Sequence, residues 1–116
     1  MSGFELVRDI RAAYELLDVL RQEERSQGLA MNAAEAKYYT VSALRVLELR
    51  EEGYAAAIID KIIKGEPKVN DALNEWRDRQ VEYKAANEAI QCEKRHIDFL
   101  IEQYKREWTK AGEYEH

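Results

Sequence analysis

The sequence predicts an all-α fold made of a helical hairpin, a short helix and one long C-terminal helix with coiled-coil character. Three observations predict it. Charged residues make up 35% of the 116 residues and apolar residues 46%, with one Pro and five Gly, a composition typical of long helices. Apolar residues recur at helical spacing along most of the chain, and Gly or Pro separates these stretches. The length indicates a single domain over residues 1–116.

The expected hairpin occupies residues 1–53. Its first helix should run from about Gly3 to Gln27. Ser2 and Glu5 have the spacing of a capping box at its start. The end of this segment is wholly polar, so we expect its last turn to face solvent. Gly28 is a residue type that commonly ends a helix, and it predicts the turn of the hairpin.

The second helix of the hairpin should span about Ala33–Glu52 and stop at Gly53. Asn32 is suited to cap its first turn, because an amide oxygen can accept hydrogen bonds from the exposed N–H groups there. The link at residues 28–31 is short, and short links favour antiparallel neighbours.

A short, strongly apolar helix is expected within residues 54–65, where Gly65 ends it. It carries four isoleucines: Ile58, Ile59, Ile62 and Ile63. Pro67 then suits the first turn of the next helix, since its missing N–H group needs no partner there. Residues 112–116 should form a frayed tail.

The long C-terminal helix is expected over residues 67–111, which contain no internal Gly or Pro. Its length would be roughly 65–70 Å at 1.5 Å per residue, against a radius of gyration of about 13 Å for a compact domain of this size. A strict seven-residue repeat keeps one seam of a helix against a partner helix. We therefore expect a second copy to cover part of the seam, most simply in a two-fold antiparallel pairing. The repeat is formed by Val69, Trp76, Tyr83, Ile90, Ile97, Tyr104 and Ala111.

Candidate interface residues follow from this seam and from the aromatic side chains along it. Trp and Tyr are enriched at binding hot spots and also pack well in seams when their polar tips reach water. The candidates are Trp76, Tyr83, Ile90, Ile97, Leu100, Tyr104 and Trp108.

The charge pattern disfavours nucleic-acid binding as the main activity. The formal net charge is −5, and the two signs alternate along the whole chain, whereas phosphates require concentrated positive charge. No signal-peptide pattern or membrane-spanning run is present in the sequence. The single cysteine, Cys92, lies off the seam and should be an inert thiol in a reducing cytoplasm.

No combination of residues indicates catalysis, so we expect a protein that is not an enzyme and binds no cofactor. The pair Glu93 and His96 has the Glu-x-x-His spacing found in di-iron bundles, but such a site needs a second pair. The only other histidine is His116, and Lys94 and Arg95 bring positive charge close by. We expect no metal site.

An alternative is a helix-turn-helix that reads DNA. Residues 45–84 offer two helices and the start of a third, on which Arg77, Arg79 and Lys84 would contact the nucleic acid. Acidic residues share that segment and would meet phosphates poorly: Asp71, Glu75, Asp78 and Glu82.

Several motifs resemble small helical proteins of phages and prophages of Gram-positive bacteria. They are Leu-Glu-Leu-Arg-Glu-Glu-Gly at 47–53, Tyr-Lys-Ala-Ala-Asn-Glu-Ala-Ile at 83–90 and Arg-Glu-Trp at 106–108. Ile59, Ile62, Gly65, Arg79 and Leu100-Ile101 also fit, so the resemblance covers roughly residues 34–108. It implies an early-region product, often encoded near recombination and single-strand-binding genes. It implies no catalytic residues.

These observations predict a non-enzymatic interaction module, a coiled-coil homodimer that is an accessory in phage DNA replication or recombination. Its partner would be a host or phage protein, reached by docking of helix faces, with charged pairs setting the register. Two alternatives stay open. One is a nucleic-acid-binding accessory or regulator, and the other is an inhibitor of a host defence nuclease, which the net charge of −5 permits.

Overall fold

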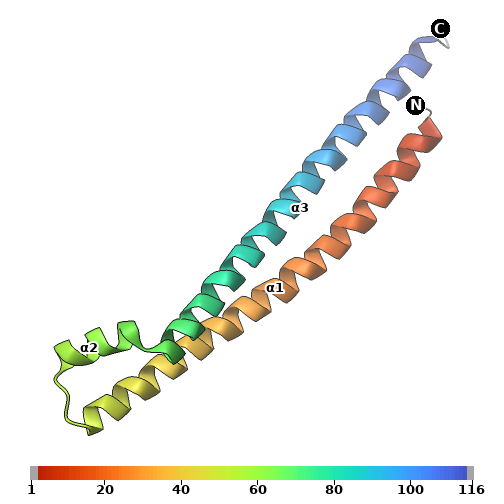
Figure 1. Cartoon of the computed structure of the whole chain (residues 1–116). Coiled ribbons are helices and arrows are strands. Elements are labelled where there is room, and N and C mark those ends of the chain that lie inside the picture. Colours follow the sequence, from red (N-terminus) through yellow and green to blue (C-terminus); the bar gives the residue numbers. More distant parts are fainter. Residues whose placement is uncertain (1–2, 115–116) are drawn as a thin grey trace. The chain divides into compact units, whose positions relative to one another are not determined.

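The computed structural model describes the backbone of residues 3–114 and the side chains of residues 3–110. Within this range the chain forms three α-helices and no strand: α1 at Gly3–Glu51, α2 at Ala56–Gly65 and α3 at Pro67–Tyr114 (Figure 1). The predicted all-α class, the short helix and the long C-terminal helix are confirmed.

The predicted break of the first helix at Gly28 is wrong. Helix α1 runs through it for 49 residues, so residues 1–53 form no hairpin and Asn32 caps no helix. Glycine inside a helix costs only about 1 kcal/mol relative to alanine, and packing can offset that. Gly28 packs closely against the ring of Tyr83. A Cβ atom added at Gly28 would lie only 3.3 Å from Cε2 of that ring. Ala34, just beyond the expected turn, is buried.

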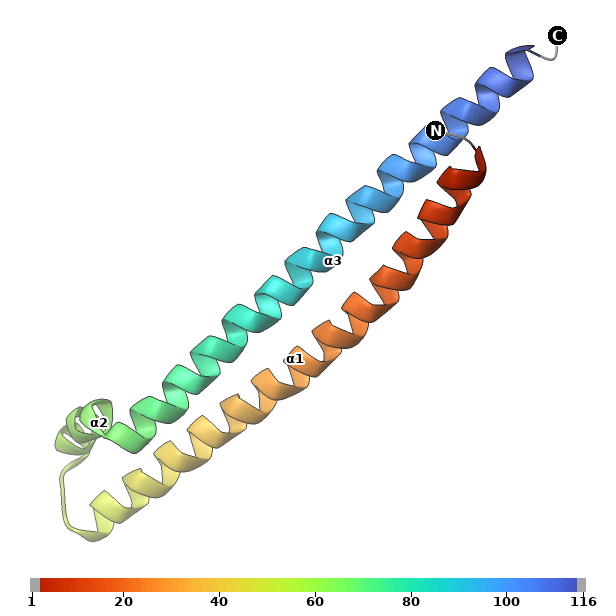
Figure 2. The ribbon, with the colours of Figure 1, turned by 45° about the vertical axis from the view of Figure 1, so that its right-hand side comes forward.

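Contacts divide the chain into two compact units, each described on its own. Unit 1 comprises residues 1–25 and 85–116, and unit 2 comprises residues 26–84. In each unit the segments of α1 and α3 lie side by side and run in opposite directions (Figure 2). The single domain over residues 1–116 stays a prediction.

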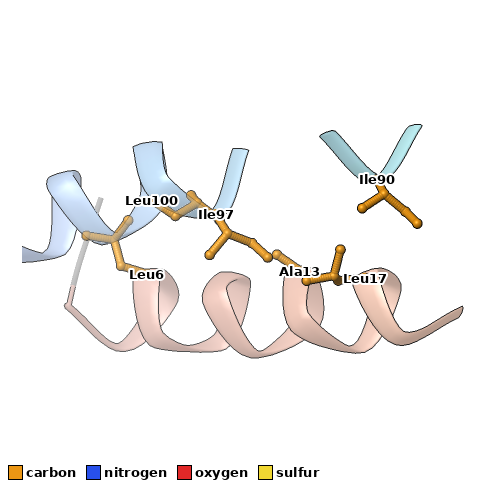
Figure 3. Close-up of a cluster of buried hydrophobic side chains, with 6 residues drawn as sticks. All are labelled: Leu6, Ala13, Leu17, Ile90, Ile97 and Leu100. Carbon is orange, nitrogen blue, oxygen red and sulfur yellow. The ribbon is translucent and has the colours of Figure 1, made fainter. Parts of the chain in front are cut away.

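Unit 1 is held together by one apolar seam. Leu6, Ala13 and Leu17 of α1 pack with Ile90, Ile97 and Leu100 of α3 (Figure 3). Ile10, Leu20, Ile101 and Tyr104 are partly buried against this cluster. The α1 members recur at intervals of three and four residues, which is the spacing of a coiled-coil seam.

The polar stretch at residues 22–27 is mostly exposed, as expected, but two of its residues contribute to packing. Glu24 and Gln27 are half-buried. In unit 1, Nδ2 of Asn87 donates a hydrogen bond of 3.0 Å to Oε2 of Glu24. Glu24 and Asn87 therefore meet at a part of α3 where the side chains facing α1 are small or polar.

Unit 2 has three helical segments around a small core. Its buried apolar residues are Ala34, Leu49, Ile59, Val69 and Ala72. Helix α2 contributes Ile59, with Ile62 and Ile63 half-buried beside it, whereas Ile58 is half exposed. The amphipathic pattern of α2 is therefore what holds it in unit 2.

Gly53 ends α1 as predicted, and the backbone explains how. Its φ of 91° is in the left-handed region, where glycine alone is free of strain. The N–H of Tyr54 donates to the carbonyl of Leu49 at 3.2 Å, and the N–H of Gly53 donates to that of Arg50 at 3.0 Å. This pair of bonds is the Schellman motif, which satisfies carbonyls left open at a helix end.

The ends of the other two helices can be compared with expectation in the same way. Helix α2, at Ala56–Gly65, lies within the expected residues 54–65. Helix α3 continues through Gly112 to Tyr114, so the expected frayed tail is wrong for residues 112–114. A single glycine costs a helix only about 1 kcal/mol relative to alanine, so Gly112 need not end α3. The expected cap at Ser2 and the last two residues lie outside the described part of the chain.

Candidate functional site

The predicted interface residues are distributed between a covered seam and an exposed surface. Ile90, Ile97 and Leu100 are buried in unit 1 against α1 of the same chain, and Tyr104 is half-buried beside them. Trp108 is exposed at 71%. In unit 1 the seam of α3 is therefore covered by α1 of the same chain, not by a second copy as expected, because α1 is one long helix rather than two short ones.

Trp76 and Tyr83, the candidates in unit 2, are both half-buried. The ring of Trp76 stacks on Tyr38 with centroids 5.6 Å apart and lies 5.9 Å from Tyr39. Tyr83 packs against Gly28. These aromatic residues therefore join α1 to α3 within unit 2, which is a packing role.

The candidate nucleic-acid contacts do not form a separate basic surface. Arg77, Arg79 and Lys84 are all exposed on α3 in unit 2, but Asp78 and Glu82 are exposed among them. Alternating signs along a helix are typical of a solvated face.

The Glu-x-x-His pair forms a local contact in unit 1. Oε1 of Glu93 lies 3.0 Å from Nδ1 of His96, and the histidine side chain is half exposed. Among the described residues, no group of three or more His, Cys, Asp or Glu side chains is placed to hold a metal ion. His116 lies outside that range.

Unit 2 has a groove of about 520 Å³ between α1 and the start of α3, here called the Leu44 groove. Val69 on its floor is buried, while Leu44 is 56% exposed. An apolar floor with a few fixed polar groups is typical of a binding site. The groove is lined by Val41, Leu44, Arg45, Glu48, Glu66, Pro67, Lys68 and Val69.

Arg45 fixes the charges at the edge of the Leu44 groove. Its Nη1 donates to Oε2 of Glu48 at 2.9 Å, and its Nε donates to Oε1 of Glu66 at 2.9 Å. Its Nη2 forms an ion pair with the same Oε1 atom, also at 2.9 Å. The hydrogen bonds to Glu48 and to Glu66 raise the pKa of the Arg45 guanidinium above its ordinary value. Glu66 is the residue between α2 and α3. The Arg45 side chain therefore links α1 to the junction of the other two helices.

The groove continues along α1 into a shallower hollow of about 300 Å³ that shares Val41 and Lys68 with it. There Nζ of Lys37 meets Oε2 of Glu75 at 3.0 Å. This side of unit 2 is thus lined by carboxylates and by ammonium groups, together with apolar residues such as Val41.

Sequence reasoning missed the Leu44 groove. The Arg45–Glu48 pair has i, i+3 spacing and could have been found. The Arg45–Glu66 pair joins residues 21 apart, and no local pattern gives that contact.

A second groove, the Phe99 groove, lies in unit 1 and has a volume of about 480 Å³. Leu16 on α1 and Phe99 on α3 line it and stay about half exposed. Its lining is Asp9, Ala12, Ala13, Leu16, Glu93, His96, Phe99 and Leu100.

No protein-family model, curated protein or solved structure matches this chain. The resemblance to phage proteins therefore stays a prediction. Along residues 3–114, no helix is both long and apolar enough to cross a membrane.

Proposed function

We propose that this chain is a non-enzymatic protein–protein interaction module, and that the Leu44 groove receives an amphipathic helix of a partner protein. One observation carries the proposal. In unit 2, α2 lies along one face of α1, whereas the Leu44 groove leaves open another face of α1, beside the start of α3.

Helix α2 shows what kind of element suits such a side. It lies beside Tyr38, Ser42 and Val46 of α1 and turns Ile59 and Ile63 toward them. The open side presents Val41 and Leu44, which are three residues apart and therefore share one face of α1. A helix with apolar residues at i, i+3 and i+4 fits a groove of this kind.

The charges around the Leu44 groove would set the register of the partner helix. Glu48 and Glu66 are held by Arg45, so they do not need a partner to stay ordered. Paired charges at the edge of an interface contribute more to specificity and association rate than to affinity. Their role here is to orient the partner rather than to transfer protons.

We further propose that the partner is a host or phage protein in the cytoplasm of a bacterial cell, and that the complex acts in phage DNA replication or recombination. The resemblance of residues 34–108 to phage proteins supports this setting. A nucleic-acid-binding role would require phosphate contacts that the interspersed acidic residues of α3 oppose. Inhibition of a host nuclease stays the second alternative, since the net charge of −5 permits it.

The test compares Leu44→Glu with Ile58→Glu. Both residues are about half exposed in unit 2, and the second lies on α2 away from the groove. Tagged wild-type protein should capture a partner from phage-infected cells after nuclease treatment. Leu44→Glu should lose that partner, and Ile58→Glu should retain it.

A photo-crosslinking residue in place of Leu44 should also join the same partner. If Leu44→Glu captures the partner as well as the wild type does, the partner does not bind in the Leu44 groove. If nuclease treatment abolishes capture by the wild type, the nucleic-acid alternative is favoured.

A further inference from the structure

Unit 1 has a second helical stripe beside its seam. On α1 it consists of residues at intervals of four and three: Glu5, Asp9, Ala12, Leu16, Val19 and Glu23. On α3 a stripe of the same spacing consists of Ala89, Cys92, His96, Phe99, Gln103 and Arg106. Both stripes contribute to the lining of the Phe99 groove, so they form one surface, here called the stripe face.

The stripe face exposes several apolar side chains beside one another in the two stripes. Val19 and Phe99 are each 59% exposed and Leu16 is 46% exposed. Ala12 and Cys92 are also exposed between them. A contiguous apolar surface with a polar edge marks an interaction site.

We propose that a second copy of this chain occupies the stripe face, so that unit 1 of two chains forms a four-helix bundle. This inference rests on the proposed function, since it treats the chain as an interaction module, but it uses a different unit and different residues. The seam residues Ile90, Ile97 and Leu100 stay inside each copy.

Charge indicates how the two copies face each other. The α1 stripe carries three carboxylates, Glu5, Asp9 and Glu23, whereas the α3 stripe carries none and includes the basic Arg106. The one carboxylate that α3 adds to the Phe99 groove, Glu93, lies 3.0 Å from His96 of the same helix. A two-fold axis parallel to the helices places each α1 stripe against the α3 stripe of the other copy. An axis perpendicular to the helices would place α1 against α1 and bring Asp9 near Glu23 when Leu16 lies at the centre. Like charges in an interface disfavour that arrangement.

Side-chain size agrees with the parallel axis. Rotation about an axis parallel to the helices keeps every residue at its own height. Residues that face each other across the Phe99 groove, such as Ala12 and Phe99, then meet between copies. The large ring of Phe99 would lie over the small Ala12, and Leu16 and Val19 over the region of Ala89 and Cys92. Large against small is the pattern of interlocking helix packing.

Analytical ultracentrifugation of Leu16→Glu and Tyr14→Glu tests the surface. Both residues are about half exposed on α1, and Tyr14 lies outside the stripe face. The wild type and Tyr14→Glu should sediment as dimers. Leu16→Glu enters the symmetric interface twice and should raise the dimer Kd on the order of 100-fold or more. Circular dichroism should show unchanged helix content in both variants.

Three results would overturn the inference. They are a monomeric wild type at high concentration, a Leu16→Glu variant that still dimerises as tightly, or a Tyr14→Glu variant that dissociates. Such failure would leave the Leu44 groove intact, because Leu44→Glu and partner capture report on unit 2 alone.

Disulfide cross-linking tests the axis. In the proposed bundle the two α3 helices are diagonal, so oxidation of the wild type should give no dimer through Cys92. Val19→Cys should give a disulfide-linked dimer, because that position meets Cys92 of the other copy. The double variant Val19→Cys/Cys92→Ser should remain unlinked. A linked dimer from the wild type or from the double variant would show α3 against α3 or α1 against α1, and would overturn the arrangement.

Discussion

Gly28 and Gly53 show what a single residue does and does not determine. Both come after a predicted helical segment, and both are the residue type that commonly ends helices. Gly53 has a φ of 91° and ends α1, whereas Gly28 stays helical against the ring of Tyr83. From the sequence alone, each glycine predicts the end of a helix. The contact that decides comes from a residue 55 positions further along the chain.

Substitution of Gly53 by alanine tests the turn. We expect Gly53→Ala to lower the free energy of unfolding by about 1 kcal/mol, because a Cβ atom opposes a positive φ. Gly65→Ala is the matched control, since no atom lies within 4 Å of the added Cβ and its φ is not positive. It should be neutral or stabilising by up to about 1 kcal/mol. Urea denaturation measures both, and equal losses would contradict the assigned role of Gly53.

At the scale of the helix, the seven-residue repeat of α3 predicted its buried face correctly. Every member of the repeat from Val69 to Tyr104 is buried or half-buried. The repeat could not say which helix covers that face, because periodicity describes one surface and not its partner. The identity of the partner followed from the length of α1, which in turn depended on Gly28.

Ile97 tests the covered seam. We expect Ile97→Ala to lower the free energy of unfolding by about 2–4 kcal/mol, since it removes buried methyl groups and leaves a cavity beside Ala13. Val81→Ala, at an exposed position of the same helix, should change it by less than about 0.5 kcal/mol. Thermal or urea unfolding gives both values. A loss at position 97 as small as that at position 81 would mean that α1 does not cover this seam.

At the scale of the whole chain, composition and periodicity predicted the helical class, the short apolar helix and the stop at Gly53. The division into two units was not predictable from them. It depends on contacts such as Arg45 with Glu66 and Asn87 with Glu24, which join residues far apart in the sequence. The two grooves share this origin, because each is lined by both α1 and α3.

The continuous segment of residues 26–84 contains all of unit 2, so we expect it to fold without the rest of the chain. The isolated fragment should be helical and unfold cooperatively, because its buried residues come from within the fragment. Isolated helices of this composition would be only marginally stable in water. Circular dichroism during heating measures the transition. The same fragment with Leu49→Ala should lose most of it, and a disordered wild-type fragment would contradict a self-contained unit.

The contact between Gly28 and Tyr83 also has a consequence for the order of events during biosynthesis. It joins the two ends of unit 2, whose residues leave the ribosome before α3 is complete. Closing a flexible loop as long as residues 26–84 costs on the order of 3–4 kcal/mol of chain entropy. Once unit 2 has folded, that cost is already met. The newly made residues 85–110 can then pair with residues 3–25 without meeting that cost again.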